Sequence, residues 1–323
     1  MASTSAVVPG QIRQTSQGFQ VGESVARLGT MVFAGTIILI TLLIVYSLTT
    51  QSWLSFSKFG FHFFATTKWD PVAEQFGALP FIYGTLVTSF VALLIAVPLG
   101  LGAAIFLAEL APAGLSSYLT FLVELLAAVP SVIYGLLAVF TLVPVMRDYI
   151  EPGLQNTLGQ LPVIGALFAG QIYGVGYLTA AIVLAVMTFP YIISISREAL
   201  LDVPVDQREA ALALGATKWE STYQIVLPNA RLGIVGAVFL GLARALGETM
   251  AVTMVIGNDP SVKASLLAAG YTIPAVIANE FTEATGNMHL SSLIALAMVL
   301  FLLTMVINGS ARLLLYATRQ RGA

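Results

Sequence analysis

The sequence predicts an all-α integral membrane protein with six transmembrane helices. Of its 323 residues, 58% are hydrophobic and only 9% are charged, whereas about a quarter of the residues of a soluble domain are charged. Several apolar segments are long enough to cross a hydrocarbon layer of about 30 Å, and one polar island interrupts them over residues 197–231. A soluble chain could not cover this much apolar surface, so a membrane-embedded class follows.

The apolar segments also define the predicted domain organisation. Residues 1–29 are polar and too long for a secretory leader, so we predict a flexible N-terminal tail before an uncleaved first span. The predicted spans cover about 30–48, 81–110, 118–145, 178–196, 232–256 and 291–314, within a transmembrane domain over 30–315 and before a C-terminal tail over 316–323. Pro98, Pro130 and Pro190 lie inside spans and predict kinks that face protein, because lipid cannot satisfy the carbonyl that a proline frees.

Lysine and arginine are distributed unequally between the two sides of the predicted membrane. Nine lie on the side of the termini and the island, and four lie in the opposite loops. Because cytoplasmic loops carry an excess of these residues, both termini and the island are predicted to be cytoplasmic.

The polar island predicts two short helices that meet at Gly215. Pro204 suits a first helical turn, and glycine can adopt the left-handed conformation that closes a helix. Thr217 and Glu220 have the spacing of a capping box, which restarts the chain as a helix. Pro228 is predicted to end this second helix, so the island forms a helix-turn-helix between spans four and five.

The chain lacks the motifs of an enzyme. It contains no Gly-x-x-x-x-Gly-Lys-Ser/Thr phosphate cradle, no Gly-x-Ser-x-Gly, no His-Glu-x-x-His and no cysteine. We therefore expect no metal or cofactor in this chain, and any ATP and Mg would be bound by a partner. The net charge of -2 argues against nucleic-acid binding.

Two charged residues lie in the middle of the fifth predicted span. A charge there costs about 2.5 to 3.5 kcal/mol on insertion scales and marks a functional site by default. Arg244 and Glu248 are four residues apart, on one face of a continuous helix. A guanidinium binds an oxyanion through two parallel hydrogen bonds, and a nearby carboxylate moderates that attraction. The alternative for Arg244 and Glu248 is a mutually neutralising pair that holds the helix against its neighbours. Glu109 and Glu124 lie near the cytoplasmic ends of their spans, so we expect a local cap or packing role for each. The predicted substrate pathway comprises Arg244, Glu248, Thr249 and Thr253.

Several motifs in the chain resemble those of a known family. The island matches the EAA loop of ABC importer permeases at Glu209, Ala210, Ala211, Gly215, Ile225, Leu227 and Pro228. Residues 77–85, 129–136, 243–249 and 270–273 are similar to segments of the C-type permeases of phosphate-specific (Pst) ABC transporters. The resemblance covers nearly everything from residue 77 onwards.

The resemblance implies the type I ABC importer permease fold, a location in the bacterial cytoplasmic (inner) membrane, and conduction of inorganic phosphate by alternating access. It implies four kinds of partner besides membrane lipid: a related A-type permease, two ATPase subunits, an extracytoplasmic phosphate-binding protein and inorganic phosphate itself. Arg244 and Glu248 match the phosphate-pathway positions of the family. The surface expected to couple to the ATPase comprises Glu209, Ala210, Ala211, Leu214 and Gly215.

Two alternative functions stay open at this point. An arginine binds any tetrahedral oxyanion, so the substrate could be sulfate, molybdate or phosphonate. A secondary anion transporter driven by an ion gradient could also bury an arginine and a glutamate, but it would need no EAA loop.

Overall fold

The computed structural model describes residues 17–162 and 164–320, with side chains described over 25–162 and 164–313. Its contacts divide the chain into two units, residues 1–50 and 51–323. Helix α1 (Gln17–Phe59) runs through the boundary. In the first unit its apolar side chains are uncovered, and hydroxyls of Thr30, Thr36 and Thr41 donate to carbonyls four residues earlier. These internal hydrogen bonds suit a helix that faces lipid.

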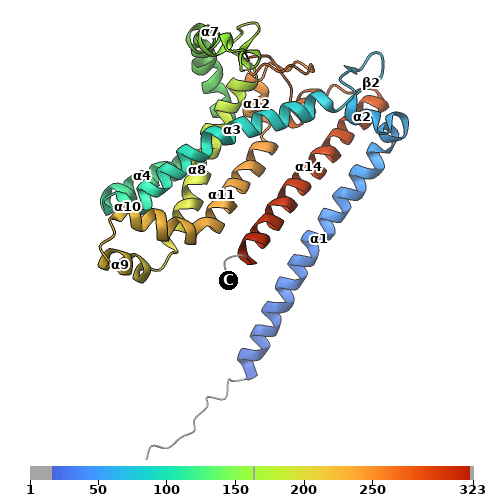
Figure 1. Ribbon diagram of the computed structural model, residues 1–323. Coiled ribbons are helices and arrows are strands. Elements are labelled where there is room, and N and C mark those ends of the chain that lie inside the picture. The colour runs from blue at the N-terminus through green and yellow to red at the C-terminus, as the bar shows by residue number, and fades with distance from the viewer. Residues whose placement is uncertain (1–16, 163, 321–323) are drawn as a thin grey trace, which may run out of the picture. The chain divides into compact units, whose positions relative to one another are not determined.

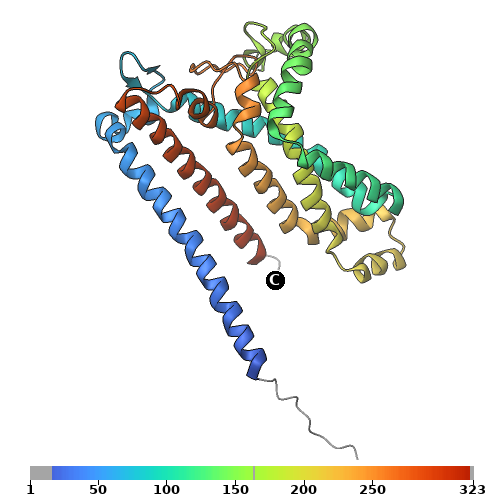
Figure 2. The ribbon, with the colours of Figure 1, turned by 180° about the vertical axis from the view of Figure 1, so that it is seen from behind.

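The second unit contains the remaining elements (Figures 1 and 2). Its main helices are α2 (His62–Ala65), α3 (Leu79–Ile105), α4 (Ala113–Ala128), α5 (Ser131–Leu137), α6 (Val143–Val145), α7 (Glu151–Thr157), α8 (Tyr177–Leu201), α9 (Val205–Ala213), α10 (Lys218–Ser221), α11 (Leu227–Gly247), α12 (Met250–Val255), α13 (Ile273–Glu280) and α14 (Asn287–Gln320). Strands β1 (Trp69–Asp70) and β2 (Gln75–Phe76) pair antiparallel. In the part of this unit that the structure describes, four π-helical turns extend or join helices: η1 (Phe106–Leu110), η2 (Ala138–Leu142), η3 (Met146–Ile150) and η6 (Thr222–Val226). Two short 3-10 turns are η4 (Leu158–Gln160) and η5 (Gly165–Phe168).

Helix α8 lies at the centre of this unit, against α3, α4 and α11. Small residues allow these helices to approach closely. A Cβ on Gly100 of α3 would lie 2.8 Å from Ile192 Cγ2, and one on Gly233 of α11 would lie 2.3 Å from Ala199 Cβ. Membrane helices associate through such backbone proximity, because lipid already solvates their apolar side chains.

Within the described residues, six helical segments are long and apolar enough to cross a membrane. They cover Val25–Phe59, Leu79–Leu110, Ser131–Gln160, Tyr177–Leu201, Lys218–Gly247 and Asn287–Leu313. The predicted all-helical, six-span class is therefore confirmed. Pro98 and Pro190 lie inside α3 and α8, as predicted.

The third predicted span, 118–145, is wrong in its boundaries. Helix α4 ends at Ala128, and both Val129 (ψ 129°) and Pro130 (ψ 139°) have extended backbone. A separate apolar stretch begins at Ser131, so Pro130 marks a break between two helices instead of a kink within one. The reason is steric: a proline ring disfavours the helical conformation of the preceding residue.

Other boundaries also differ from the predictions. Helix α1 already begins at Gln17, so 17–29 are helical where a flexible tail was expected; residues 1–16 lie outside the described residues. Helix α14 continues to Gln320, into the predicted C-terminal tail. Pro228 does not end the second island helix. It occupies the first turn of α11, where its fixed φ and missing N–H are tolerated.

Candidate functional site

Two helix breaks meet near the centre of the second unit. One separates α4 from α5, and the other separates α11 from α12 at Glu248, whose backbone is extended (φ -71°, ψ 126°). Helices α5 and α12 pack closely: a Cβ on Gly135 would lie 2.6 Å from Met254 Sδ and 3.1 Å from Ala251 Cα. The motif segments 129–136 and 243–249 are thereby brought to one place.

Two tyrosines satisfy the carbonyls at the broken end of α4. The Tyr134 hydroxyl donates to the carbonyl of Leu126 at 2.7 Å, and the Tyr191 hydroxyl donates to that of Ala127 at 3.2 Å. The last carbonyls of a helix have no partner within it, and an unsatisfied one is expensive in a membrane. The tyrosines therefore stabilise the end of α4, where these carbonyls would be costly to leave unsatisfied in lipid.

Arg244 lies in the last turn of α11, beside this break. Its guanidinium carbon is 4.4 Å from the centroid of the Tyr191 ring, which is a cation–π contact. Its Nε is buried and has no hydrogen-bond partner among the described residues. Arg244 lines a cavity of about 450 Å³ together with Tyr191, Leu240, Ala243, Gly247 and Glu248. The Arg244 side chain lines the cavity, and the described residues show no ion pair for its guanidinium, which suits the binding of an oxyanion there.

Glu248 does not form the helix-face pair that the sequence predicts. Because α11 ends at Gly247, the four-residue spacing no longer places Arg244 and Glu248 on one continuous face, and the described residues show no ion pair between them. Glycine is a weak helix former, which favours an end at this position. Glu248 Oε1 instead accepts a hydrogen bond from the Ala251 N–H at 3.4 Å. It lines the cavity while holding the start of α12.

The hydroxyls of the two predicted pathway threonines donate to backbone carbonyls two and four residues earlier in the chain. Thr249 Oγ1 donates to the Gly247 carbonyl at 3.3 Å, and Thr253 Oγ1 donates to the Thr249 carbonyl at 2.7 Å. Neither is among the residues that line the Arg244 cavity. Their place on the pathway stays a prediction.

The other two motif segments meet at the end of the unit that carries the β hairpin. Thr85 Oγ1 accepts a hydrogen bond from the Ile273 N–H at 2.9 Å, and a Cβ on Gly84 would lie 2.1 Å from the Tyr271 carbonyl oxygen. The Tyr271 hydroxyl accepts from Asn279 Nδ2 at 2.9 Å, and burial raises the pKa of this phenol above its usual value. These segments join α3 to α13 by packing.

The polar island forms the expected helix-turn-helix. Gly215 has φ +91°, and the capping box is complete, with Glu220 N–H to Thr217 Oγ1 at 3.3 Å and Thr217 N–H to Glu220 Oε2 at 2.8 Å. A surface hollow of about 480 Å³ lies over this region. Ala210, Ala211 and Leu214 line it, whereas Glu209 and Gly215 do not. The predicted coupling residues thus share one short segment, and three of them share one hollow.

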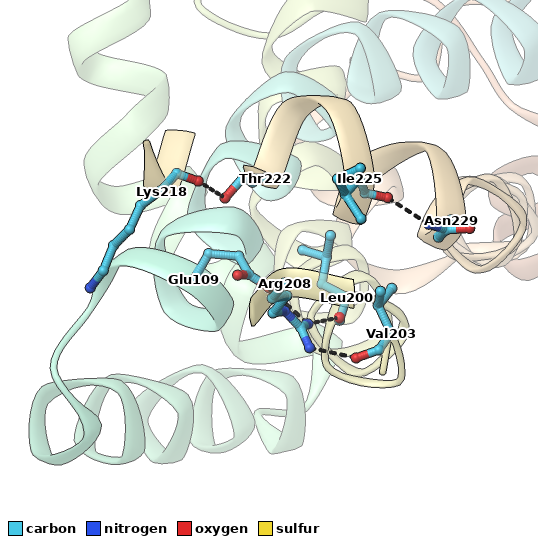
Figure 3. A network of polar contacts seen from close by, with 8 residues as sticks. All are labelled: Glu109, Leu200, Val203, Arg208, Lys218, Thr222, Ile225 and Asn229. Atoms are coloured by element: carbon cyan, nitrogen blue, oxygen red, sulfur yellow. Dashed lines mark hydrogen bonds and ion pairs between the residues drawn. The ribbon is translucent and has the colours of Figure 1, made fainter. Parts of the chain in front are cut away.

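Sequence reasoning missed the ion pair between Arg208 and Glu109. Arg208 Nη2 lies 2.9 Å from Glu109 Oε1 and joins α9 to η1 (Figure 3). Glu109 was expected to have only a local role. The sequence did contain a signal for this ion pair: a carboxylate lies at the end of an apolar span, and an arginine lies directly before the EAA residues. Tyr191 was also missed, although it directly follows Pro190 in a span.

Comparison with known proteins identifies a family. A family described as "Binding-protein-dependent transport system inner membrane component" matches residues 96–320. The chain is 48% identical over 284 residues to the phosphate transport system permease protein PstC of Mesorhizobium japonicum, covering 87% of each chain. It is 52% identical over 256 residues to PstC of Xylella fastidiosa strain Temecula1, covering 79% of each.

Solved structures show the same fold at low sequence identity. An inward-facing MetNI methionine ABC transporter aligns with a TM-score of 0.56 at 19% identity, covering 73% of this chain and 94% of that one. A bacterial ABC transporter that imports alginate aligns with a TM-score of 0.56 at 16% identity, covering 91% and 98%. Both are similar in fold alone. The family match and the identity of 48% and 52% to two PstC proteins show that the chain belongs to the PstC family of phosphate transport system permeases.

Proposed function

We propose that the chain is the permease subunit through which an ATP-driven importer conducts inorganic phosphate across the bacterial cytoplasmic membrane. The observation that carries the proposal is Arg244 itself: its buried Nε has no hydrogen-bond partner among the described residues, and its side chain lines a cavity beside the break between α11 and α12. Broken helices near the middle of a membrane protein are common where a polar substrate passes. Phosphate offers the oxygen acceptors that this guanidinium lacks.

The charges that line the cavity suit transient binding of an anion better than permanent binding. Arg244 attracts an anion, while the Tyr191 ring supports its guanidinium by a cation–π contact. Glu248 places a carboxylate on the same cavity, and the described residues show no ion pair between this carboxylate and Arg244. Conduction requires binding strong enough for the anion to arrive and weak enough for it to leave. A cation and an anion on one cavity meet both requirements.

The energy source lies outside this chain. In the proposal, two ATPase subunits bind ATP and Mg, a related A-type permease completes the passage, and an extracytoplasmic binding protein delivers phosphate. This chain is non-catalytic, and both of its termini and its helix-turn-helix are cytoplasmic, as the distribution of basic residues favours.

The helix-turn-helix is the proposed contact with the ATPase. The hollow beside Ala210, Ala211 and Leu214 offers an apolar surface, and Leu214 itself is 90% exposed. The island connects directly to α8 and α11, which carry Tyr191 and Arg244. Closure of the ATPase dimer would move the island, and through these two helices it would alter access to the cavity.

Guanidinium chemistry alone does not separate phosphate from sulfate or molybdate, so the choice of phosphate rests on the similarity to PstC proteins. The test is ATP-dependent uptake of labelled phosphate into vesicles that hold the full assembly, with unlabelled phosphate, sulfate or molybdate as competitors. We expect only unlabelled phosphate to compete. An assembly that hydrolyses ATP but takes up no phosphate would contradict the proposed substrate.

A further inference from the structure

We propose that Glu109 and Arg208 form a latch that makes the cytoplasmic end of α3–η1 move together with α9 during transport. The inference rests on the proposed function, because it concerns how motion of α9 reaches the spans. Chain connectivity links the island only to α8 and α11. The latch would add a third span, α3, which precedes α8 in the chain and has no direct chain connection to the island.

The latch is built around the Arg208 side chain (Figure 3). Arg208 Nη2 and Nε donate to Glu109 Oε1 at 2.9 and 3.3 Å. Nη2 also donates to the Leu200 carbonyl at 2.6 Å, and Nη1 donates to the Val203 carbonyl. One guanidinium therefore joins η1, the end of α8 and the turn before α9.

The pair is shielded from water. The side chains of Arg208 and Glu109 are only 16% and 12% exposed, whereas the other Lys/Arg ion pairs of the described residues are at least 37% exposed on each side. Exposed ion pairs contribute little, but removal of one partner of a shielded pair leaves a charge without compensation. This contact is therefore a firm mechanical connection between segments 99 residues apart.

The neighbouring residue fixes α9 on a second side. Gln207 Oε1 accepts a hydrogen bond from Asn229 Nδ2 at 3.0 Å, and Asn229 Nδ2 also donates to the Ile225 carbonyl at 2.8 Å. Gln207 thus ties α9 to α11, and Arg208 ties it to η1. Two consecutive side chains hold one short helix between two spans, so a push on its exposed face would displace both.

The substitution that isolates the latch is Glu109→Gln. It removes the charge of the pair but leaves Arg208 bonded to the Leu200 and Val203 carbonyls, so the end of α8 keeps its partners. Glu124→Gln is the matched control, because Glu124 is an exposed glutamate on α4. The measured quantity is labelled phosphate taken up per ATP hydrolysed by the full assembly in vesicles.

We expect Glu109→Gln to lower phosphate uptake per ATP several-fold while the assembly still forms and hydrolyses ATP, and Glu124→Gln to keep the wild-type ratio. A purely structural pair would change the amount of assembly without changing this ratio. A wild-type ratio in Glu109→Gln would overturn the latch.

A second variant keeps the proposal testable if Glu109→Gln fails to assemble. The chain has no cysteine, so Glu109→Cys combined with Arg208→Cys adds a unique thiol pair that a short bifunctional maleimide can join, in an assembly whose partners are also free of cysteine. If η1 and α9 move together, cross-linking restores the ratio of uptake to ATP hydrolysis. Cross-linked assemblies that hydrolyse ATP without uptake would show that the two segments must separate.

Rejection of the latch can be distinguished from rejection of phosphate as the substrate. If the wild-type assembly takes up sulfate instead of phosphate, the substrate assignment falls, and the same ratio is measured with labelled sulfate. An unchanged ratio for the transported anion in Glu109→Gln would then reject the latch independently.

Discussion

The guanidinium of Arg244 lies 4.4 Å from the centre of the Tyr191 ring. The same tyrosine donates its hydroxyl to the Ala127 carbonyl at the broken end of α4. One side chain on α8 thus supports a cation on α11 and a helix end on α4. The position of Arg244 depends on three helices, which makes it sensitive to their relative movement.

Tyr191 separates these two roles experimentally. Tyr191→Phe keeps the ring and loses the hydroxyl, whereas Tyr191→Leu loses both. A cation–π contact contributes about 0.5 to 2 kcal/mol, so we expect Tyr191→Leu to raise the KM for phosphate by about 2- to 30-fold. Tyr191→Phe should leave KM near wild type and lower thermal stability, because one hydrogen bond contributes about 1 kcal/mol. Equal KM values for the two variants would argue against support by the ring.

Glu248 is expected to limit how long the anion stays. Glu248→Gln removes the negative charge but keeps an oxygen that can accept from the Ala251 N–H. We therefore predict a lower KM for phosphate and a lower maximal uptake rate, because the anion binds more tightly and leaves more slowly. Initial rates over a range of phosphate concentrations measure both. If both parameters stay at wild type, the Glu248 charge has no role in passage.

Gly135 permits the close packing of α5 and α12. A Cβ at this position would lie 3.1 Å from Ala251 Cα and closer still to Met254 Sδ, so Gly135→Val forces the two helices apart. Overpacking of this kind costs about 1 to 3 kcal/mol. Thermal unfolding of the purified assembly should show the loss, and uptake should fall. Gly102→Ala in α3 is the control, since nothing lies within 4 Å of its added Cβ; a similar loss there would reject the packing explanation.

Gly215 closes α9 with φ +91°, in open space. A β-branched residue is strained at positive φ, so Gly215→Val should distort the turn without creating a clash. We predict that stimulation of ATP hydrolysis by the proposed phosphate-binding protein falls while membrane insertion persists. Gly236→Ala, on α11 with nothing within 4 Å of the added Cβ, is the control. Normal stimulation in Gly215→Val would mean that the turn does not couple to the ATPase.

Local chemistry in the sequence was sufficient to predict the helix-turn-helix. Gly215, Thr217 and Glu220 specify a turn and a cap through residues a few positions apart. The number of spans was also predictable, because membrane crossing depends on the length and composition of single segments. Both features are properties of neighbouring residues.

The features that were missed depend on distant residues or on conflicting local signals. Pro130 is compatible with a kink or a break, and the hydroxyls of Tyr134 and Tyr191 that stabilise a break come from other helices. Gly247 likewise lies within an apolar run whose composition does not reveal the end of α11. The Arg208–Glu109 pair joins residues 99 positions apart, which no local pattern specifies.

The central claim is that phosphate passes Arg244, and the most direct measurement is uptake of labelled phosphate by assemblies with Arg244→Gln and Arg244→Lys. Arg147→Gln is the control, because Arg147 is an exposed arginine paired with Asp148 away from the cavity. We predict that Arg244→Gln abolishes uptake, that Arg244→Lys retains a small part of it because lysine lacks the two-pronged geometry, and that Arg147→Gln transports normally. Wild-type uptake by a fully assembled Arg244→Gln variant would contradict the claim and leave Arg244 a structural partner of Tyr191.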